Sequence, residues 1–189
     1  IYLCFGQSNM EGNAAIEDID RTGVNPRFQA MYAVDDEKAG WKKGQWHTAV
    51  PPQARPSTGL TPVDYFGRKM VDNLPDSIKV GTITVAVGGA SIDLFDKRTY
   101  KAYLKKQPDW MKNFASQYNG NPYARLMELA NLLVGCNNGA YLFCNATDRF
   151  QKLSDKITAP VLNFSLDGDQ NIWISTNGQG VFRYNRTTH

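Results

Sequence analysis

The sequence predicts an α/β fold, in which a parallel sheet with helices is followed by a short all-β segment. Up to Leu133, apolar strand-like runs alternate with helical patterns, an order typical of parallel sheets. After Leu133 the helical periodicity ends, and short aromatic strands alternate with Asn/Gly turns. We therefore expect two parts, residues 1–133 and residues 134–189.

Three strands of the first part are predicted from their apolar or β-branched runs. Residues 1–5 are mostly apolar and end at a glycine, as in a buried parallel strand. Residues 27–34 fit a second strand, and residues 41–58, rich in Trp, Gln and Pro, are expected to form a loop. Residues 78–87 are rich in β-branched side chains, which favours a central strand.

Three helices are predicted between and after these strands. Thr61 is suited to cap a helix that has Pro62 at its first position and ends near Asn73. A short helix is expected at 100–106, within a polar and aromatic region at 91–118. The last helix begins at Asn121 and Pro122 and runs to Leu133, with an apolar side formed by Leu126, Met127, Leu129, Ala130 and Leu133.

The composition excludes several classes of protein. Of the 189 residues 42% are hydrophobic, too many for a disordered chain, and no apolar run approaches the ~20 residues of a membrane-spanning helix. The net charge of +3, from 21 basic and 18 acidic residues, is spread along the chain, so no nucleic-acid partner is predicted. The three cysteines form no C-x-x-C pair, and neither a metal site nor a cofactor is predicted.

The last part of the chain contains an internal repeat. Residues 134–143 match residues 174–184 with one inserted residue, and the two starts lie 40 residues apart (174 minus 134). A period of this length, built of strands and Asn-Gly turns, is typical of β-propeller blades. The alternative is that two similar hairpin turns arose by chance.

Ser8 follows the first predicted strand by three residues, at the start of a short helix. In open parallel sheets reactive groups gather at the carboxyl ends of strands, where a serine on a Gly-led turn can expose its oxygen. The alternative is structural, because Ser8–Glu11 has the S-x-x-E spacing of a capping box. Gly88 and Gly89 occupy the matching place after residues 78–87, either as oxyanion donors or as an ordinary turn.

Five segments together resemble a known family. Residues 1–12, IYLCFGQSNMEG, resemble block I of the SGNH/GDSL hydrolases, in their sialate O-acetylesterase and acetylxylan esterase branch (carbohydrate esterase family 6-like). Later motifs of this branch resemble, in the same order, residues 59–70, 80–95, 108–111 and 121–130. The resemblance implies that residues 1–133 form part of a flavodoxin-like (SGNH) sheet.

The resemblance also implies an activity. It makes Ser8 the nucleophile of a metal-free hydrolase that removes O-acetyl groups from carbohydrates, of the sialate or xylan type, through an acetyl-serine intermediate. The oxyanion donors are then the backbone amides of Ser8 and of Gly89 or Gly88. Contacts with an acetylated carbohydrate are expected from Gln7, Asn9, Ser91 and His47.

Two motifs of this family are absent. It continues with a Gln-Gly-Glu-Ser-Asn-like block and ends with an Asp-x-x-His motif that supplies the base, and neither occurs after Leu133. The only histidines are His47, which the resemblance places in a substrate-side loop, and His189, which has no aspartate three residues earlier. We therefore expect weak or absent turnover.

The end of the chain resembles a second family, the periplasmic two-component regulator propeller repeat. In residues 164–185 Ser175 replaces the usual glycine, and the matching positions are Asp169, Asn171, Trp173, Thr176, Gly180 and Tyr184. The alternatives to an esterase are thus a fragment of a glycan-sensing propeller, or a non-functional fusion of two pieces. Both resemblances imply a periplasmic or secreted protein, although the chain has no signal peptide.

A truncated sheet has consequences for assembly. We expect one side of the strand at 78–87 to be unpaired, which would favour oligomers through the exposed sheet edge or pairing with the C-terminal strands. Four aromatic residues are candidates for stacking on a sugar ring or for core packing: Trp41, Trp46, Tyr65 and Trp110.

Overall fold

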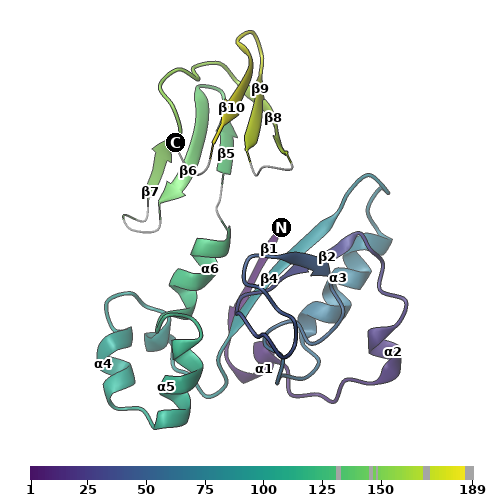
Figure 1. Cartoon of the computed structure of the whole chain (residues 1–189), viewed down its shortest axis with the longest axis vertical. Coiled ribbons are helices and arrows are strands. Elements are labelled where there is room, and N and C mark those ends of the chain that lie inside the picture. Colours follow the sequence, from purple (N-terminus) through teal and green to yellow (C-terminus); the bar gives the residue numbers. More distant parts are fainter. Residues whose placement is uncertain (131–132, 145–146, 148, 168–170, 186–189) are drawn as a thin grey trace. The chain divides into compact units, whose positions relative to one another are not determined.

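The chain has two compact units, Ile1–Ala130 and Asn131–His189, each described by itself. The computed structural model describes residues 1–130, 133–144, 147, 149–167 and 171–185 (Figure 1). The first unit is a mixed α/β structure with a mainly parallel sheet, and the second consists of two small antiparallel sheets. The predicted fold class is therefore confirmed.

The sheet of the first unit has four strands in the order β1-β4-β2-β3. The strands are β1 (Tyr2–Gly6), β2 (Phe28–Met31), β3 (Trp46–Thr48) and β4 (Val80–Ala86). β4 runs parallel to both β1 and β2, whereas β3 pairs antiparallel with β2. All seven residues of β4 are buried, as expected of a central strand.

Three predictions about this sheet are wrong. β4 is paired on both sides, so within the described residues the edge strands are β1 and β3, and not the strand at 78–87. The C-terminal strands form sheets of their own and do not extend this one. The segment at 41–58, expected to be a loop, contains β3, because β2 offers it an edge that the local sequence does not reveal.

The two faces of the sheet are covered by different helices. One face packs against α3 (Pro62–Asp72), with Val80 meeting Val63 and Val71. The other packs against α5 (Asp109–Ser116) and α6 (Pro122–Ala130), through Ile83 and Val85. Alternate residues of β4 thus enter opposite cores, which makes a three-layer arrangement. The remaining helices are α1 (Ser8–Glu11), α2 (Asp18–Arg21), η1 (Ile92–Leu94) and α4 (Tyr100–Lys105).

The start of α3 confirms the predicted cap. Thr61 Oγ1 accepts a hydrogen bond from the Val63 N–H at 3.0 Å, and Asp64 Oδ2 accepts one from the Thr61 N–H at 2.8 Å. Burial raises the pKa of the Asp64 carboxyl and outweighs the hydrogen bonds from Thr61 and Gln53, which lower it. α4 and α6 also lie where helices were predicted, but α6 ends at Ala130, and Leu133, expected on its apolar side, instead begins the strand β5 (Leu133–Cys136). α5 was missed, because its N-cap is Pro108, which forms no side-chain hydrogen bond that would mark the start.

The second unit contains two three-stranded antiparallel sheets, ordered β5-β6-β7 and β10-β9-β8. Their strands are β5 (Leu133–Cys136), β6 (Gly139–Cys144), β7 (Arg149–Lys152), β8 (Val161–Leu166), β9 (Ile172–Thr176) and β10 (Gly180–Tyr184). A small core of Ala140, Ile157 and Ile174 lies within this unit.

The two copies of the repeat form equivalent hairpins. β5 and β6 pair up to Cys136 and Gly139, and β9 and β10 pair up to Thr176 and Gly180. The inserted residue of the second copy therefore lies in the turn, where it leaves the strands unchanged. The resemblance to propeller repeats stays a prediction, and its Asp169 lies outside the described residues.

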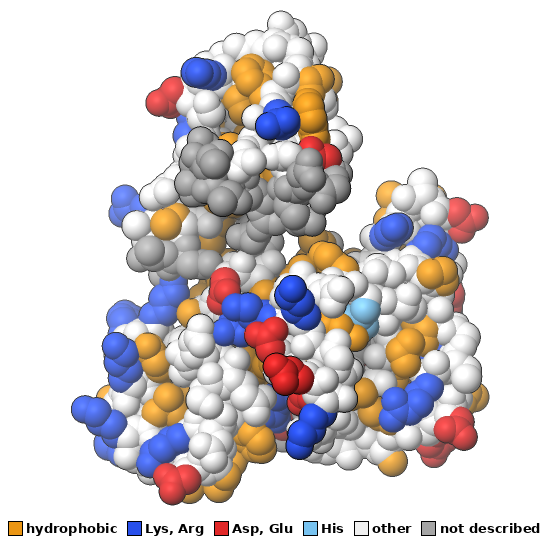
Figure 2. All heavy atoms as spheres, viewed as in Figure 1, with side chains coloured by type: hydrophobic (Ala, Val, Ile, Leu, Met, Phe, Trp, Pro, Cys, Tyr) orange, Lys and Arg blue, Asp and Glu red, His pale blue; other side chains and the backbone are white. Residues whose placement is uncertain are grey.

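The described surface agrees with the weak overall charge. Basic side chains are interspersed with acidic and uncharged ones on the face drawn in Figure 2. Within the described residues, no helix is long and apolar enough to cross a membrane.

The packing of Gly67 in α3 gives a test of this fold. Exchanging a helical glycine for alanine at an exposed position stabilises a protein by about 1 kcal/mol. At Gly67 the added methyl group would overlap the ring of the buried Phe28 on β2. We expect Gly67→Ala to lower the free energy of unfolding by about 1–3 kcal/mol in urea denaturation. Lys69→Ala, at an exposed position of the same helix, should change it by less than about 0.5 kcal/mol; a stabilised Gly67→Ala would contradict the described contact.

Candidate active site

The parallel pairing of β1 with β4 brings two loops together. Gly6 is level with Ala86 in the register, so Ser8 and Gly88 both follow at the same edge of the sheet. A methyl group placed on Gly88 would lie 3.8 Å from Ser8 Cβ. The structure thus juxtaposes the predicted nucleophile and the predicted glycine turn.

Ser8 does not cap α1. The N-cap is Gln7, whose Oε1 accepts hydrogen bonds from the Ser8 N–H at 3.2 Å and from Ser8 Oγ at 3.0 Å. The capping-box interpretation of Ser8–Glu11 is therefore wrong, since Ser8 is the first helical residue and Glu11 turns away from the cap. The half-buried Ser8 hydroxyl is left without a structural role in the helix.

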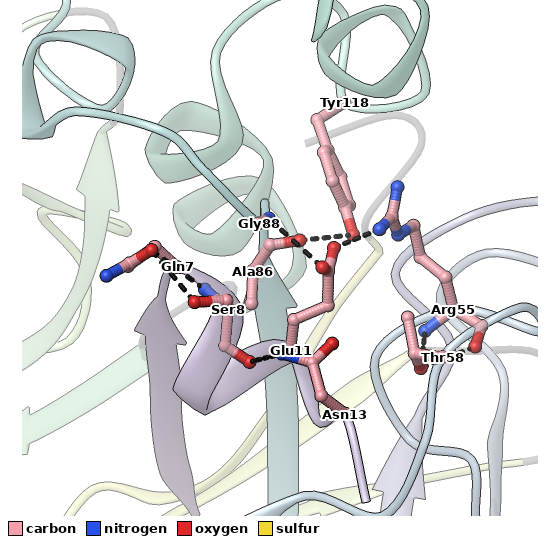
Figure 3. A network of polar contacts seen from close by, with 9 residues as sticks. All are labelled: Gln7, Ser8, Glu11, Asn13, Arg55, Thr58, Ala86, Gly88 and Tyr118. Carbon is pink, nitrogen blue, oxygen red and sulfur yellow. Dashed lines mark hydrogen bonds and ion pairs between the residues drawn. The ribbon is translucent and has the colours of Figure 1, made fainter. Parts of the chain in front are cut away.

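Glu11 instead forms a buried polar network (Figure 3). Its side chain lies between Gly88 and Arg55: Oε2 accepts a hydrogen bond from the Gly88 N–H at 3.1 Å, and Oε1 forms an ion pair with Arg55 Nη2. Glu11 is 7% and Arg55 2% exposed. The sequence does not predict this pair, because 44 residues separate the partners. Its one local sign is the acidic residue Glu11 within the S-x-x-E spacing.

Aromatic side chains complete the surroundings of this network. The Arg55 guanidinium lies 4.1 Å from the centroid of the Phe114 ring on α5, a cation–π contact. The Tyr118 hydroxyl donates to Ala86 O at 3.4 Å, and burial raises the pKa of Tyr118 far above its ordinary value. Tyr118 therefore stays protonated and serves as a hydrogen-bond donor to the end of β4.

Gly89 is the glycine whose amide is available. The Gly88 N–H is used by Glu11, whereas the Gly89 N–H donates to no group among the described residues. Gly89 is exposed and has φ of +72°, a conformation that favours glycine. A methyl group there would also lie 3.2 Å from the Trp110 indole, which is 50% exposed.

An open groove begins at Ser8. Its volume is about 520 Å³, and it lies between α1 and the start of α3. The lining residues are Ser8, Asn9, Asn13, Ala14, Leu60, Thr61, Pro62 and Tyr65. Of the predicted substrate contacts, Asn9 therefore lies in this groove and Gln7 lies against Ser8.

His47 is not brought to Ser8. His47 pairs with Ala30 and Ala30 with Thr82, which in turn is level with Tyr2 at the start of β1. Three strand spacings of about 4.8 Å put β3 about 14 Å from β1 across the sheet. The His47 ring stacks on Tyr32 with centroids 3.8 Å apart, and its Nδ1 lies 2.8 Å from Thr48 O, so its role here is packing.

The predicted contact Ser91 has a structural partner, and the second histidine is not described. Ser91 caps η1, with its Oγ accepting from the Asp93 N–H at 3.3 Å. His189 lies outside the described residues. Across the part of the chain that the structure describes, no three His, Cys, Asp or Glu side chains gather where they could hold a metal ion.

A comparison with protein families agrees with this geometry. The family model described as carbohydrate esterase, sialic acid-specific acetylesterase, matches residues 1–121. The match covers more than half of the chain and contains β1 to β4, α1 to α5 and both loops that meet at Ser8.

The half-buried position of His47 predicts a pH dependence of stability. Burial lowers the pKa of His47 in the folded protein below its ordinary value of about 6.5, and this effect outweighs the hydrogen bond to Thr48, which raises the pKa. As the pH falls through 6.5 the unfolded chain takes up the proton first, so the free energy of unfolding should decrease below about pH 6.5. His47→Phe, which keeps the stacked ring, should remove this component in urea denaturation at several pH values.

An NMR titration gives the direct reading. The His47 ring protons should titrate below pH 6.5, with His189→Asn used to assign the second histidine signal. A midpoint at or above 6.5 would contradict the lowered pKa of this half-buried ring.

Proposed function

The chain belongs to the sialic acid-specific acetylesterase family of carbohydrate esterases, and on that basis we propose that its first unit cleaves acetyl esters of carbohydrates with Ser8 as the nucleophile. The observation that carries the proposal is the meeting of Ser8 with the exposed turn of Gly88 and Gly89 at one edge of the sheet. Acyl transfer requires a nucleophilic hydroxyl beside a backbone N–H that can donate a hydrogen bond to the oxyanion.

The chemistry follows from these groups. Ser8 Oγ attacks the acetyl carbonyl carbon and passes its proton to solvent water, which returns a proton to the leaving sugar oxygen, while the carbonyl oxygen becomes an oxyanion that accepts hydrogen bonds from the Ser8 and Gly89 amides. Collapse breaks the ester C–O bond, and the sugar oxygen leaves with a proton. Water then attacks the acetyl-serine, which releases acetate and restores the Ser8 hydroxyl.

Gln7 has to move in this scheme. Its Oε1 now accepts from both the Ser8 hydroxyl and the Ser8 amide, the two groups that the reaction needs. The Gln7 residue is exposed, so rotation of its side chain exchanges these hydrogen bonds for bonds to water at small cost. An incoming acetyl group would take the same place.

The rate is limited by the proton acceptor. Within the described residues, Gln7 is the sole side chain that hydrogen-bonds Ser8 Oγ, and an amide oxygen is not a base at neutral pH. Members of a catalytic triad act as a unit, and without the base the oxyanion donors and substrate binding retain about 10³–10⁴-fold acceleration over water. We therefore propose a slow hydrolysis that depends on Ser8.

The groove beside Ser8 is suited to the sugar. Asn9 and Asn13 supply polar groups along it, and Tyr65 supplies an aromatic ring that is 51% exposed. Sugars are bound by this combination of hydrogen bonds and a ring face against their C–H groups. Trp110, beside Gly89, is a second exposed ring near the same turn.

Hydrolysis of p-nitrophenyl acetate tests the proposal. We expect the chain to release p-nitrophenol above the buffer rate and Ser8→Ala to remove this excess, because the acetyl acceptor is gone. Ser77→Ala, an exposed serine that follows α3, should retain the full rate. O-acetylated sialic acid and acetylated xylo-oligosaccharide, compared by acetate release, then distinguish the two sugar classes.

Two results would reject the proposal. One is an equal rate in the wild-type chain and Ser8→Ala, which would assign the hydrolysis to another group. The other is the absence of any rate above buffer while circular dichroism shows both proteins folded.

A further inference from the structure

We propose that Glu11 is a positioning residue, which holds the turn at Gly88 so that the Gly89 amide faces the acyl group on Ser8. This inference rests on the function proposed above, because it assigns the support of that same oxyanion donor. Glu11 touches no reacting atom; it acts through the backbone of Gly88.

The first line of evidence is the close fit between Glu11 and Gly88. Glu11 Oε2 lies 3.1 Å from the Gly88 nitrogen, and a methyl group on Gly88 would come within 2.5 Å of the same oxygen. The carboxylate therefore reaches the backbone only because position 88 has no side chain. Gly88 has no positive φ that would require glycine, so the close approach of Glu11 is the feature of the structure that favours glycine here.

The second line of evidence is the shared helix. Ser8 and Glu11 lie three residues apart on α1, and so on neighbouring positions of one turn. A hydrogen bond from Gly88 to Glu11 thus ties the turn after β4 to the helix that carries the nucleophile. With the Gly88 amide used in this way, the next amide along the chain is the one left to point outward.

The third line of evidence is the burial of the charge. Glu11 and Arg55 form an ion pair at 7% and 2% exposure. Replacing a buried ion pair with apolar residues of similar volume is often neutral or stabilising, so such a pair is weak evidence for a stabilising role. An apolar replacement would lose the carboxylate that accepts the hydrogen bond from the Gly88 amide and that Arg55 holds in place.

Two double variants separate positioning from packing. Glu11→Leu with Arg55→Met removes the ion pair and the acceptor, whereas Glu11→Gln with Arg55→Met removes the ion pair but keeps an oxygen for Gly88. We expect the Leu/Met variant to lose at least about tenfold in kcat for p-nitrophenyl acetate with KM within about twofold, since a misplaced oxyanion donor affects the transition state. The Gln/Met variant should regain most of that loss.

Asp76→Asn is a matched control. Asp76 forms an ion pair with Arg27, and the Asp76 side chain is fully exposed. The substitution therefore also removes a carboxylate from an ion pair. Its kcat should equal the wild-type value. Equal kcat in the two double variants would overturn the inference, because the acceptor at position 11 would then be irrelevant.

Amide hydrogen exchange of the wild-type chain gives a reading that needs neither activity nor a variant. The Gly88 amide should be protected at least about tenfold relative to an unstructured peptide, and the Gly89 amide should exchange rapidly. An unprotected Gly88 amide would overturn the inference. This test applies even if the double variants do not fold. Loss of Ser8-dependent hydrolysis with a protected Gly88 would reject the proposed function and leave the contact between Glu11 and Gly88 in place.

Discussion

The parallel pairing of β1 with β4, in the register Gly6↔Ala86, ends both strands at one edge of the sheet. Everything at the candidate site depends on this register, because α1 begins after one strand and the glycine turn follows the other. The pairing itself is secured from both sides, since β4 is buried along its whole length between β1 and β2. A slip by one residue would turn the apolar side chains of β4 to the wrong faces, so the two helical layers fix the register.

The buried polar groups near this edge satisfy one another only in part. Arg55 pairs with Glu11 through Nη2, while its Nε and Nη1 are buried without a hydrogen-bond partner among the described residues. The ring of Phe114 lies against the same guanidinium and stabilises the cation through its π face. Helix α5 thus contributes to a network that begins on α1, although its sequence gave no sign of this.

How far the sequence predicts this structure depends on the range of the interactions. Thr61, Pro62 and Asp64 mark the start of α3 because capping is a contact between neighbours, and the β-branched run identifies β4 for a similar local reason. β3 and the order of the strands were missed because they depend on which edges meet in space. The sequence predicts that Ser8 and the glycine turn each follow a strand, and the structure brings them together, whereas for Glu11 the sequence offers only the alternative of a cap, since the S-x-x-E spacing contains no information about Arg55.

The oxyanion arrangement and the proton-transfer machinery are separable parts of an acyl-transfer site. The first part requires only a register, a turn and a buried acceptor, all of which residues 1–121 contain. The second requires a base within reach of Ser8 Oγ, and His47 is excluded from that role by about 14 Å of intervening sheet. A preorganised amide acts on the charge of the transition state whichever group accepts the proton, so the oxyanion donor proposed at Gly89 does not depend on the identity of the base.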